Sequence, residues 1–264
     1  MPFLDHGNFE FRRKVDNPHR PATNRMTDTT NTLKQAYTNF YLKSGGPAVF
    51  PNEYVVRIFR GKYPRLSLGV TDFHGMKICD LGCGDGRNIL PLAGLGFESY
   101  GMEITAQICN KVQSELEARG VFAMIRPGEN SLIPFENDFF DYLLSWNSCY
   151  YMGPLESYCD FDIYVQEFFR VLKPSGKLVL SIPRASNFIF EGSEEINPGY
   201  RCISHDPYGI RNGQVMRCFS DEDSIVSAFG SYFQNFVFGH LLDDCFGQKN
   251  DYFLMVCDKK NDIA

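Results

Sequence analysis

The residues best suited to bind a ligand lie where a short apolar segment meets a glycine-rich turn. The apolar residues within segment 76–81 are bounded by glycines on both sides, which predicts a buried parallel strand. An acidic residue and three alternating glycines end this segment: Asp80, Gly82, Gly84 and Gly86. Glycine tolerates positive φ and, without a Cβ, lets a ligand lie directly on the backbone. The helix predicted over residues 87–95 directs its unpaired N–H groups at the same point.

The spacing of the glycines distinguishes between classes of ligand. Dinucleotide-binding turns read G-x-G-x-x-G, whereas this turn reads G-x-G-x-G, and the Gly-Lys-Ser/Thr ending of a phosphate-binding loop is absent. Asp80 would also meet a pyrophosphate with like charge. A ligand with a positive group and no phosphate fits better. An NAD-dependent oxidoreductase is therefore disfavoured, and an ordinary glycine-rich strand-to-helix turn is the alternative without function.

A second acidic residue ends the next predicted strand, residues 98–103. Because neighbouring parallel strands end at the same edge of a sheet, Glu103 should lie close to the glycine turn. A carboxylate there can accept hydrogen bonds from the two hydroxyls of a ribose. The alternative is a solvated charge at the end of a strand.

Together these residues resemble the first motif of the class I (Rossmann-like) S-adenosylmethionine-dependent methyltransferases, apolar-apolar-Asp-x-Gly-x-Gly-x-Gly. The resemblance implies S-adenosylmethionine as cofactor, a molecule with an ammonium, a carboxylate and a sulfonium group. It covers residues 76–181 strongly and 219–258 weakly. It also implies the fold class, an α/β, doubly wound, mostly parallel seven-stranded sheet with an antiparallel last strand, an N-terminal helical lid and an insertion after the fifth strand.

Three further segments resemble this family. Residues 128–135 are similar to its Gly-Asp-x-x-x-Leu-Pro-Phe loop, which implies that Gly128 and Glu129 face the adenine. Residues 137–146 are similar to its fourth strand, so Ser145 and Trp146 are expected beside the cofactor. Residues 172–181 are similar to its Leu-Lys-Pro-Gly-Gly turn and fifth strand.

The chain divides into three expected parts, the last of which contains an insertion. Residues 1–28 lack periodicity and predict a flexible arm, and residues 29–75 predict a helical cap. Tyr41 lies on an aromatic helical stripe of this cap and is expected to reach the cofactor, the alternative being core packing. Residues 76–264 form the methyltransferase-like core, and residues 184–217 form an insertion on the acceptor side. The insertion shows no strong periodicity and is expected to be a long functional loop.

Catalytic candidates are few. If the acceptor is a hydroxyl, a base must take its proton, and His205, Asp206 and His240 are the available groups. Tyr150 and Tyr151 follow the fourth strand, where many relatives carry histidines, and are expected to position the acceptor. A lone loop histidine is more often a plain surface residue.

Composition limits the partners. The net charge of −6 disfavours nonspecific nucleic-acid binding, and residues 145–148 lack the Asn/Asp-Pro-Pro-Tyr signature of nucleic-acid methylating relatives. Nine cysteines without a Cys-x-x-Cys pair indicate a reduced, cytoplasmic protein with no metal site. No segment has the length of a membrane span. The sequence leaves homo-oligomerisation open.

The sequence thus predicts S-adenosylmethionine-dependent methyl transfer to a small-molecule acceptor. An oxygen of a sugar, phosphate or carboxylate group is the favoured target. The alternative is a regulator or scaffold that binds S-adenosylmethionine without turnover.

Overall fold

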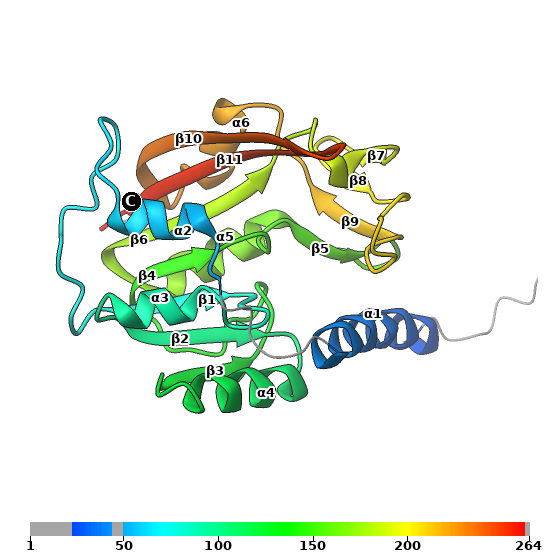
Figure 1. Ribbon diagram of the computed structural model, residues 1–264. Helices are drawn as coiled ribbons and strands as arrows, with labels where there is room; N and C mark the ends of the chain where they lie inside the picture. Colours follow the sequence, from blue (N-terminus) through cyan, green and yellow to red (C-terminus); the bar gives the residue numbers. More distant parts are fainter. Residues whose placement is uncertain (1–22, 44–49, 262–264) are drawn as a thin grey trace, which may run out of the picture.

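The computed structural model describes residues 23–43 and 50–261, which form two sheets with flanking helices (Figure 1). The main sheet has the strand order β10-β11-β6-β4-β1-β2-β3. Its strands are β1 (Lys77–Leu81), β2 (Glu98–Glu103), β3 (Ala123–Pro127), β4 (Phe140–Ser145), β6 (Leu172–Pro183), β10 (Phe233–Cys245) and β11 (Gln248–Lys259). Strands β3, β2, β1, β4 and β6 run parallel to one another. Strand β11 runs antiparallel to both of its neighbours, β6 and β10. This topology confirms the predicted fold class.

The central strands are apolar because helices cover both of their faces. One face packs Ile78, Leu144 and Val179 against α2 (Glu53–Arg60) and α3 (Ile89–Gly94), and α4 (Ala106–Glu117) packs beside them against β3. The other face packs against α5 (Phe161–Val171) and α6 (Glu222–Phe229). The sheet is therefore doubly wound, and its parallel strands all end at one edge, where the acidic residues lie.

Local sequence explains where these helices begin. Helix α2 is capped by Asn52, whose Oδ1 accepts from the N–H of Tyr54 at 3.0 Å. Thr105 caps α4, and Asp221 caps α6 in a reciprocal capping box with Ser224. Helix α5 begins after its cap Asp160, whose side chain accepts from the N–H of Asp162.

A second, four-stranded sheet was not predicted. It consists of β5 (Tyr151–Pro154), β7 (Glu194–Asn197), β8 (Tyr200–Cys202) and β9 (Gln214–Arg217), all antiparallel in the order β5-β9-β8-β7. The insertion is therefore not a long loop, and it also contains a short 3₁₀ helix, η1 (Phe188–Phe190). Its strands are three or four residues long and β7 is largely exposed, so they leave no alternating apolar pattern in the sequence.

Helix α1 (Thr23–Lys43) does not pack on a face of the main sheet. It contacts α4 and β5 (Figure 1). It begins within the segment predicted as a flexible arm. The rest of that arm, residues 1–22, lies outside the described residues. No helix in the described ranges is both long enough and apolar enough to span a membrane.

Candidate active site

The glycine turn after β1 adopts the conformation that its sequence predicts. Gly82, Gly84 and Gly86 have φ values of 70°, 59° and 76°, which side chains rarely tolerate. The N–H groups of Gly82 and Cys83 donate to the carbonyl of Met102 in β2, at 2.9 and 3.1 Å. A Cβ on Gly84 would lie 2.9 Å from the hydroxyl oxygen of Tyr41. The turn is thus fixed to β2 on one side and covered by α1 on the other.

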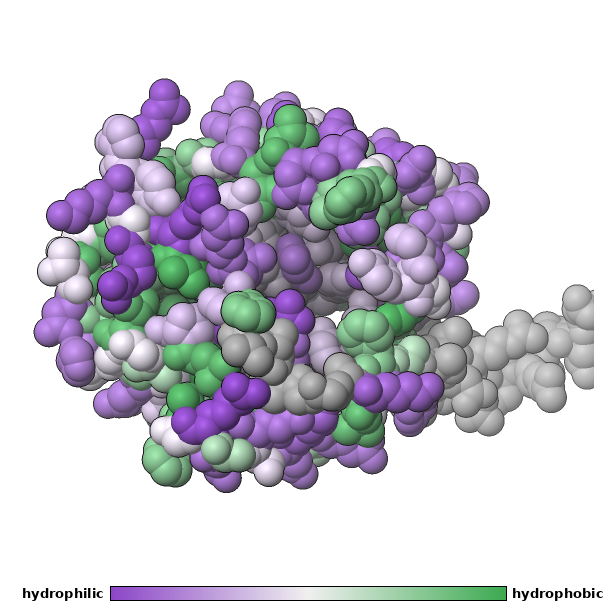
Figure 2. All heavy atoms as spheres, viewed as in Figure 1, coloured by the Kyte–Doolittle hydropathy of each residue, from purple (hydrophilic) through white to green (hydrophobic). Residues whose placement is uncertain are grey.

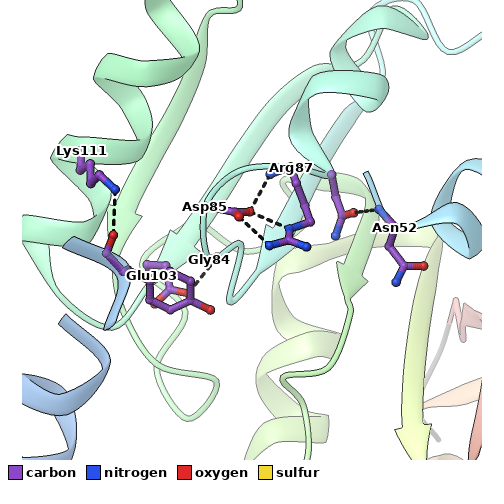
Figure 3. A network of polar contacts seen from close by, with 8 residues as sticks. Asn52, Gly84, Asp85, Arg87, Glu103 and Lys111 are labelled. Atoms are coloured by element: carbon purple, nitrogen blue, oxygen red, sulfur yellow. Dashed lines mark hydrogen bonds and ion pairs between the residues drawn. The ribbon is translucent and has the colours of Figure 1, made fainter. Parts of the chain in front are cut away.

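Glu103 lies at the end of β2 against this turn, as predicted (Figure 3). Its Oε1 accepts from the N–H of Gly84 and its Oε2 from the N–H of Ile104, both at 2.9 Å. Burial raises the pKa of Glu103, and these two backbone hydrogen bonds partly oppose the rise. Each carboxylate oxygen can accept a further hydrogen bond, so Glu103 is suited to a ligand with two neighbouring hydroxyls.

Asp80, at the end of β1, is buried and unsatisfied. It is 1% exposed, and neither carboxylate oxygen has a hydrogen-bond partner within the described residues. Burial is the main cause that raises the pKa of Asp80 to about 8, and the charge of Glu103 is the second. The Asn88 side chain lies close enough to oppose this rise in part, although it forms no hydrogen bond to Asp80 of good geometry. A buried carboxylate without a partner is costly unless a cation or donor meets it. Asp80 therefore fits a ligand with a positively charged group.

Helix α1 closes over these acidic residues. Lys111 of α4 donates to the backbone carbonyl of Tyr41 at 2.7 Å (Figure 3), and Thr38 lies 3.2 Å from Thr105 between their hydroxyl oxygens. Tyr41 has its pKa raised by burial first and by Glu103 next. Its hydroxyl therefore stays protonated at neutral pH and can act as a hydrogen-bond donor at the predicted position.

The loop after β3 connects α1 to the site in a way the sequence did not show. Gly128 donates its N–H to the carbonyl of Glu103 at 2.9 Å, but Glu129 forms an ion pair of 2.5 Å with Lys34 of α1. The next residue, Asn130, donates to the carbonyl of Ser148 at 3.2 Å and leaves its Oδ1 buried without a partner. Asn130 occupies an unspecified position of the loop motif, so sequence reasoning could not single it out.

Ser145 and Trp146, predicted beside the cofactor at the end of β4, are both buried among protein groups. Ser145 is fully buried, with its Oγ 2.8 Å from that of Ser148, which lies 2.5 Å from the carbonyl of Leu81. Trp146 is buried in the apolar cluster of α2 and α3. Ser148 contacts the glycine turn directly, because a Cβ on Gly82 would lie 2.7 Å from its own Cβ. Ser148 is thus a wall residue of the site that the sequence analysis missed.

A cluster of tyrosines lies about one turn along α1 from the glycine turn, because Tyr37 and Tyr41 are four residues apart and share one face of the helix. Tyr150 and Tyr151 stack with ring centroids 4.9 Å apart, and Tyr37 meets Tyr151 edge-on at 6.3 Å. Burial is the main cause that raises the pKa of Tyr37 and Tyr150. Both hydroxyls are therefore neutral at physiological pH. Viewed as in Figure 1, the surface is hollowed between α1 and the second sheet, as Figure 2 shows.

The three acid–base candidates of the sequence are not brought together. Asp206 is buried; its Oδ2 accepts from the N–H groups of Ile210 and Arg211, and its Oδ1 lies 3.3 Å from Nη1 of Arg211. His205 is exposed, and its Nδ1 lies 3.0 Å from the Oγ of Ser204. Together with Asp206 it lines a surface hollow of about 620 Å³.

His240 is also exposed, with its Nε2 3.1 Å from Glu222. Its strand, β10, is the edge of the main sheet and is paired only with β11 within the described residues. Of the three candidates, Asp206 alone contacts the tyrosine cluster, and it does so through Arg211.

Comparison with known proteins agrees with this geometry. Residues 79–180 match the family model described as "Methyltransferase domain". A curated relative, the ubiquinone biosynthesis O-methyltransferase of Chelativorans sp., is 26% identical over 121 residues, which are 46% of this chain and 44% of the relative. The chain thus spans less than half the length of the curated relative it matches.

Solved structures share the fold. A methyltransferase from Methanosarcina mazei superposes with a TM-score of 0.56 at 19% identity, over 76% of this chain and 99% of that one. The Burkholderia thailandensis 1,6-didemethyltoxoflavin-N1-methyltransferase, solved with its substrate and S-adenosylhomocysteine, superposes with a TM-score of 0.58 at 14% identity, over 93% of both chains. At these identities the likeness concerns the fold alone.

Proposed function

Because this chain contains a class I, S-adenosylmethionine-dependent methyltransferase domain, we propose that it methylates an oxygen atom of a small-molecule acceptor. The observation that carries the proposal is the buried, unpartnered carboxylate of Asp80 beside Glu103, at the ends of two adjacent parallel strands. The name of the curated relative states that it is an O-methyltransferase. The stacked tyrosines on the proposed acceptor side suit a small molecule better than a macromolecule.

The residues present fit this cofactor. S-adenosylmethionine, when bound, supplies a methyl group on a positively charged sulfur. Asp80 would accept from its ammonium group and Glu103 from its ribose hydroxyls, while Gly82, Gly84 and Gly86 leave room for close backbone approach.

Four more residues would border the cofactor: Gly128, Asn130, Ser148 and Tyr41. Gly128 and Asn130 lie on the loop that resembles the family's adenine loop. Glu129, predicted beside the adenine, would instead hold α1 closed through Lys34. Ser145 and Trp146 would support the site from behind, since both are buried.

Catalysis would rest on alignment and exclusion of water, which in-line displacement at carbon mainly requires. Helix α1 covers the glycine turn, and the neutral hydroxyls of Tyr37 and Tyr150 can donate to the acceptor but are poor bases. Tyr150 would therefore position the acceptor. Asp206 would position Arg211 rather than take a proton, because its carboxylate already accepts two backbone hydrogen bonds. His205 is exposed and would not touch the acceptor.

The test has two stages. Calorimetric titration of the full chain with S-adenosylhomocysteine should show binding in the micromolar range, and Asp80→Ala should abolish it. Incubation with radiolabelled S-adenosylmethionine and fractionated small-molecule extracts should then label one fraction. Binding without transfer to any fraction would favour a scaffold, and absence of heat in the first stage would overturn the proposed function.

A further inference from the structure

Arg211 differs from the other arginines of the insertion in what its side chain contacts. Arg201 donates from Nε and Nη2 to Ser193, and Arg217 donates from Nη1 to two backbone carbonyls. The Nε and Nη1 atoms of Arg211 are instead buried without a hydrogen-bond partner. Nη1 lies 3.3 Å from Oδ1 of Asp206, which is longer than the 2.7–2.9 Å typical of a charge-assisted hydrogen bond. This ion pair therefore leaves most of the hydrogen-bonding capacity of the guanidinium unused.

The backbone holds Arg211 against the tyrosine cluster. The carbonyl of Arg211 accepts from the N–H of Gln214, the first residue of β9. Strand β9 pairs with β5, in which Tyr151 lies opposite Met216, and Arg217 donates its N–H to the carbonyl of Tyr150 at 2.9 Å. The turn that carries Arg211 is closed by Asp206. Arg211 is therefore fixed by main-chain contacts rather than held loosely.

The hydroxyl of Tyr37, in the tyrosine cluster beside Arg211, is a donor without an acceptor. The Tyr37 hydroxyl is buried without a hydrogen-bond partner, and its ring meets Tyr151 edge-on. Burial lowers the pKa of Arg211, but its proximity to Tyr151, Asp206 and Tyr37 raises it more, so the guanidinium stays charged. Nε and Nη1 of a fixed cation and the hydroxyl of Tyr37 are buried without a hydrogen-bond acceptor, although Asp206 lies 3.3 Å from Nη1. A second anionic group would therefore complete this part of the site.

We propose that Arg211 and Tyr37 bind an oxyanion of the acceptor, a carboxylate or phosphate group, and so determine acceptor specificity. This inference rests on the proposed function and adds the chemical class of its acceptor. Tyr151 contacts Tyr37 of α1, and α1 also covers the glycine turn through Tyr41. The oxyanion would thus be held about one turn along α1 from Tyr41, on the same face of the helix, with the rest of the acceptor directed towards the cofactor.

The experiment uses the full chain saturated with S-adenosylhomocysteine and three probes of similar size: benzoate, phenyl phosphate and neutral benzamide. Calorimetry should show benzoate or phenyl phosphate binding at least about tenfold tighter than benzamide, the scale of a hydrogen-bonded charge. Whichever of the two anions binds more tightly identifies the oxyanion that the site recognises, a carboxylate or a phosphate group. Arg211→Gln should remove the preference, whereas the matched control Arg201→Gln should retain it.

S-adenosylhomocysteine binding separates this inference from the proposed function. Arg211→Gln should bind S-adenosylhomocysteine as the wild type does, which also reports that the variant is folded. If Arg211→Gln does not fold, Tyr37→Phe, which removes only the hydroxyl, should weaken the preferred anion about threefold or more. Equal binding of all three probes, no binding of any, or an unchanged preference in the folded variants would overturn the inference. Failure of the wild type to bind S-adenosylhomocysteine would overturn the proposed function instead.

Discussion

The carboxylate of Glu103 accepts a hydrogen bond of 2.9 Å from the backbone N–H of Gly84, so an acidic side chain of β2 holds the glycine turn that follows β1. Its other oxygen accepts from Ile104, at the start of the next segment. One side chain therefore supports the turn and also offers lone pairs to a ligand. Stability and the proposed cofactor binding are therefore expected to be coupled at this residue.

Glu103→Ala should lower both stability and cofactor affinity. Two buried backbone donors would lose their acceptor, and each such loss costs about 1–3 kcal/mol. Urea unfolding should show the loss in the free energy of unfolding, and calorimetry should show affinity for S-adenosylhomocysteine reduced at least about tenfold. Glu98→Ala, at the exposed start of β2, is the matched control and should change neither quantity. Unaltered binding by Glu103→Ala would contradict a ribose-binding role.

Asp80→Asn should stabilise the ligand-free protein while abolishing cofactor binding. The pKa of Asp80 rises from 3.8 to about 8 on folding, so the folded chain holds a proton that the unfolded chain loses between these pH values. The free energy of unfolding of the wild type therefore falls as pH rises through this range. Removing the charge should raise Tm by several degrees at pH 8, since 1 kcal/mol corresponds to about 2–4 °C for a domain of this size.

Scanning fluorimetry at pH 8 and pH 5 tests this expectation. The gain in Tm should shrink at pH 5, where wild-type Asp80 is already protonated in the folded state. A variant that is less stable than the wild type at pH 8 would show that Asp80 has a stabilising partner.

Binding of S-adenosylhomocysteine should strengthen as pH rises towards 8. In the proposed binding mode the ammonium group pairs with ionised Asp80, which is protonated below its pKa of about 8 in the free protein. Affinity should therefore fall as pH drops below this value, by at most about tenfold per pH unit, and binding should release a proton. Calorimetry in two buffers of different ionisation heat measures the release. Affinity that stays constant from pH 6 to pH 8 would sink this prediction.

Gly84→Ala should destabilise the protein and weaken cofactor binding. Gly84 has a φ of 59°, which costs an alanine about 1–2 kcal/mol, and its new Cβ would lie 2.9 Å from the Tyr41 hydroxyl. Gly94→Ala is the matched control, because its Cβ would meet nothing within 4 Å and alanine favours a helix. Adding Tyr41→Leu to Gly84→Ala should recover part of the loss, which a double-mutant cycle in urea measures.

Lys34→Ala should leave stability almost unchanged but speed cofactor release. Its ion pair with Glu129 is partly exposed, and such pairs contribute about 0–1 kcal/mol. The pair nevertheless ties α1 to the loop after β3. Stopped-flow displacement should show faster dissociation of S-adenosylhomocysteine from Lys34→Ala than from the control Lys62→Ala, an exposed loop residue. Equal rates would mean that α1 does not restrain the cofactor.

The parts of the site predicted from sequence are those encoded by neighbouring residues. The turn at Gly82 and the acidic strand ends at Asp80 and Glu103 follow from short motifs, and the comparisons confirm the family and fold that these motifs imply. The roles of individual residues in binding and catalysis stay predictions.

The second sheet could not be predicted, because it depends on pairing between distant segments. Strand β5 finds its partner β9 about sixty residues later, and neither is long enough to show periodicity. Arg211 was one of several charged residues in a region without pattern, and only the paired strands reveal its position against Tyr150 and Tyr151. Asn130 and Ser148 likewise gain their positions from contacts between separate loops.

Helix α1 is fastened to the core by partly exposed polar contacts on both sides of the site: Lys34 with Glu129, and Lys111 with the Tyr41 carbonyl. Water competes readily for contacts of this kind, so a helix held in this way can detach while the main sheet stays intact. If α1 excludes solvent during the proposed reaction, its detachment would also open the exit for the spent nucleoside. The rate of that detachment would then set an upper limit on turnover.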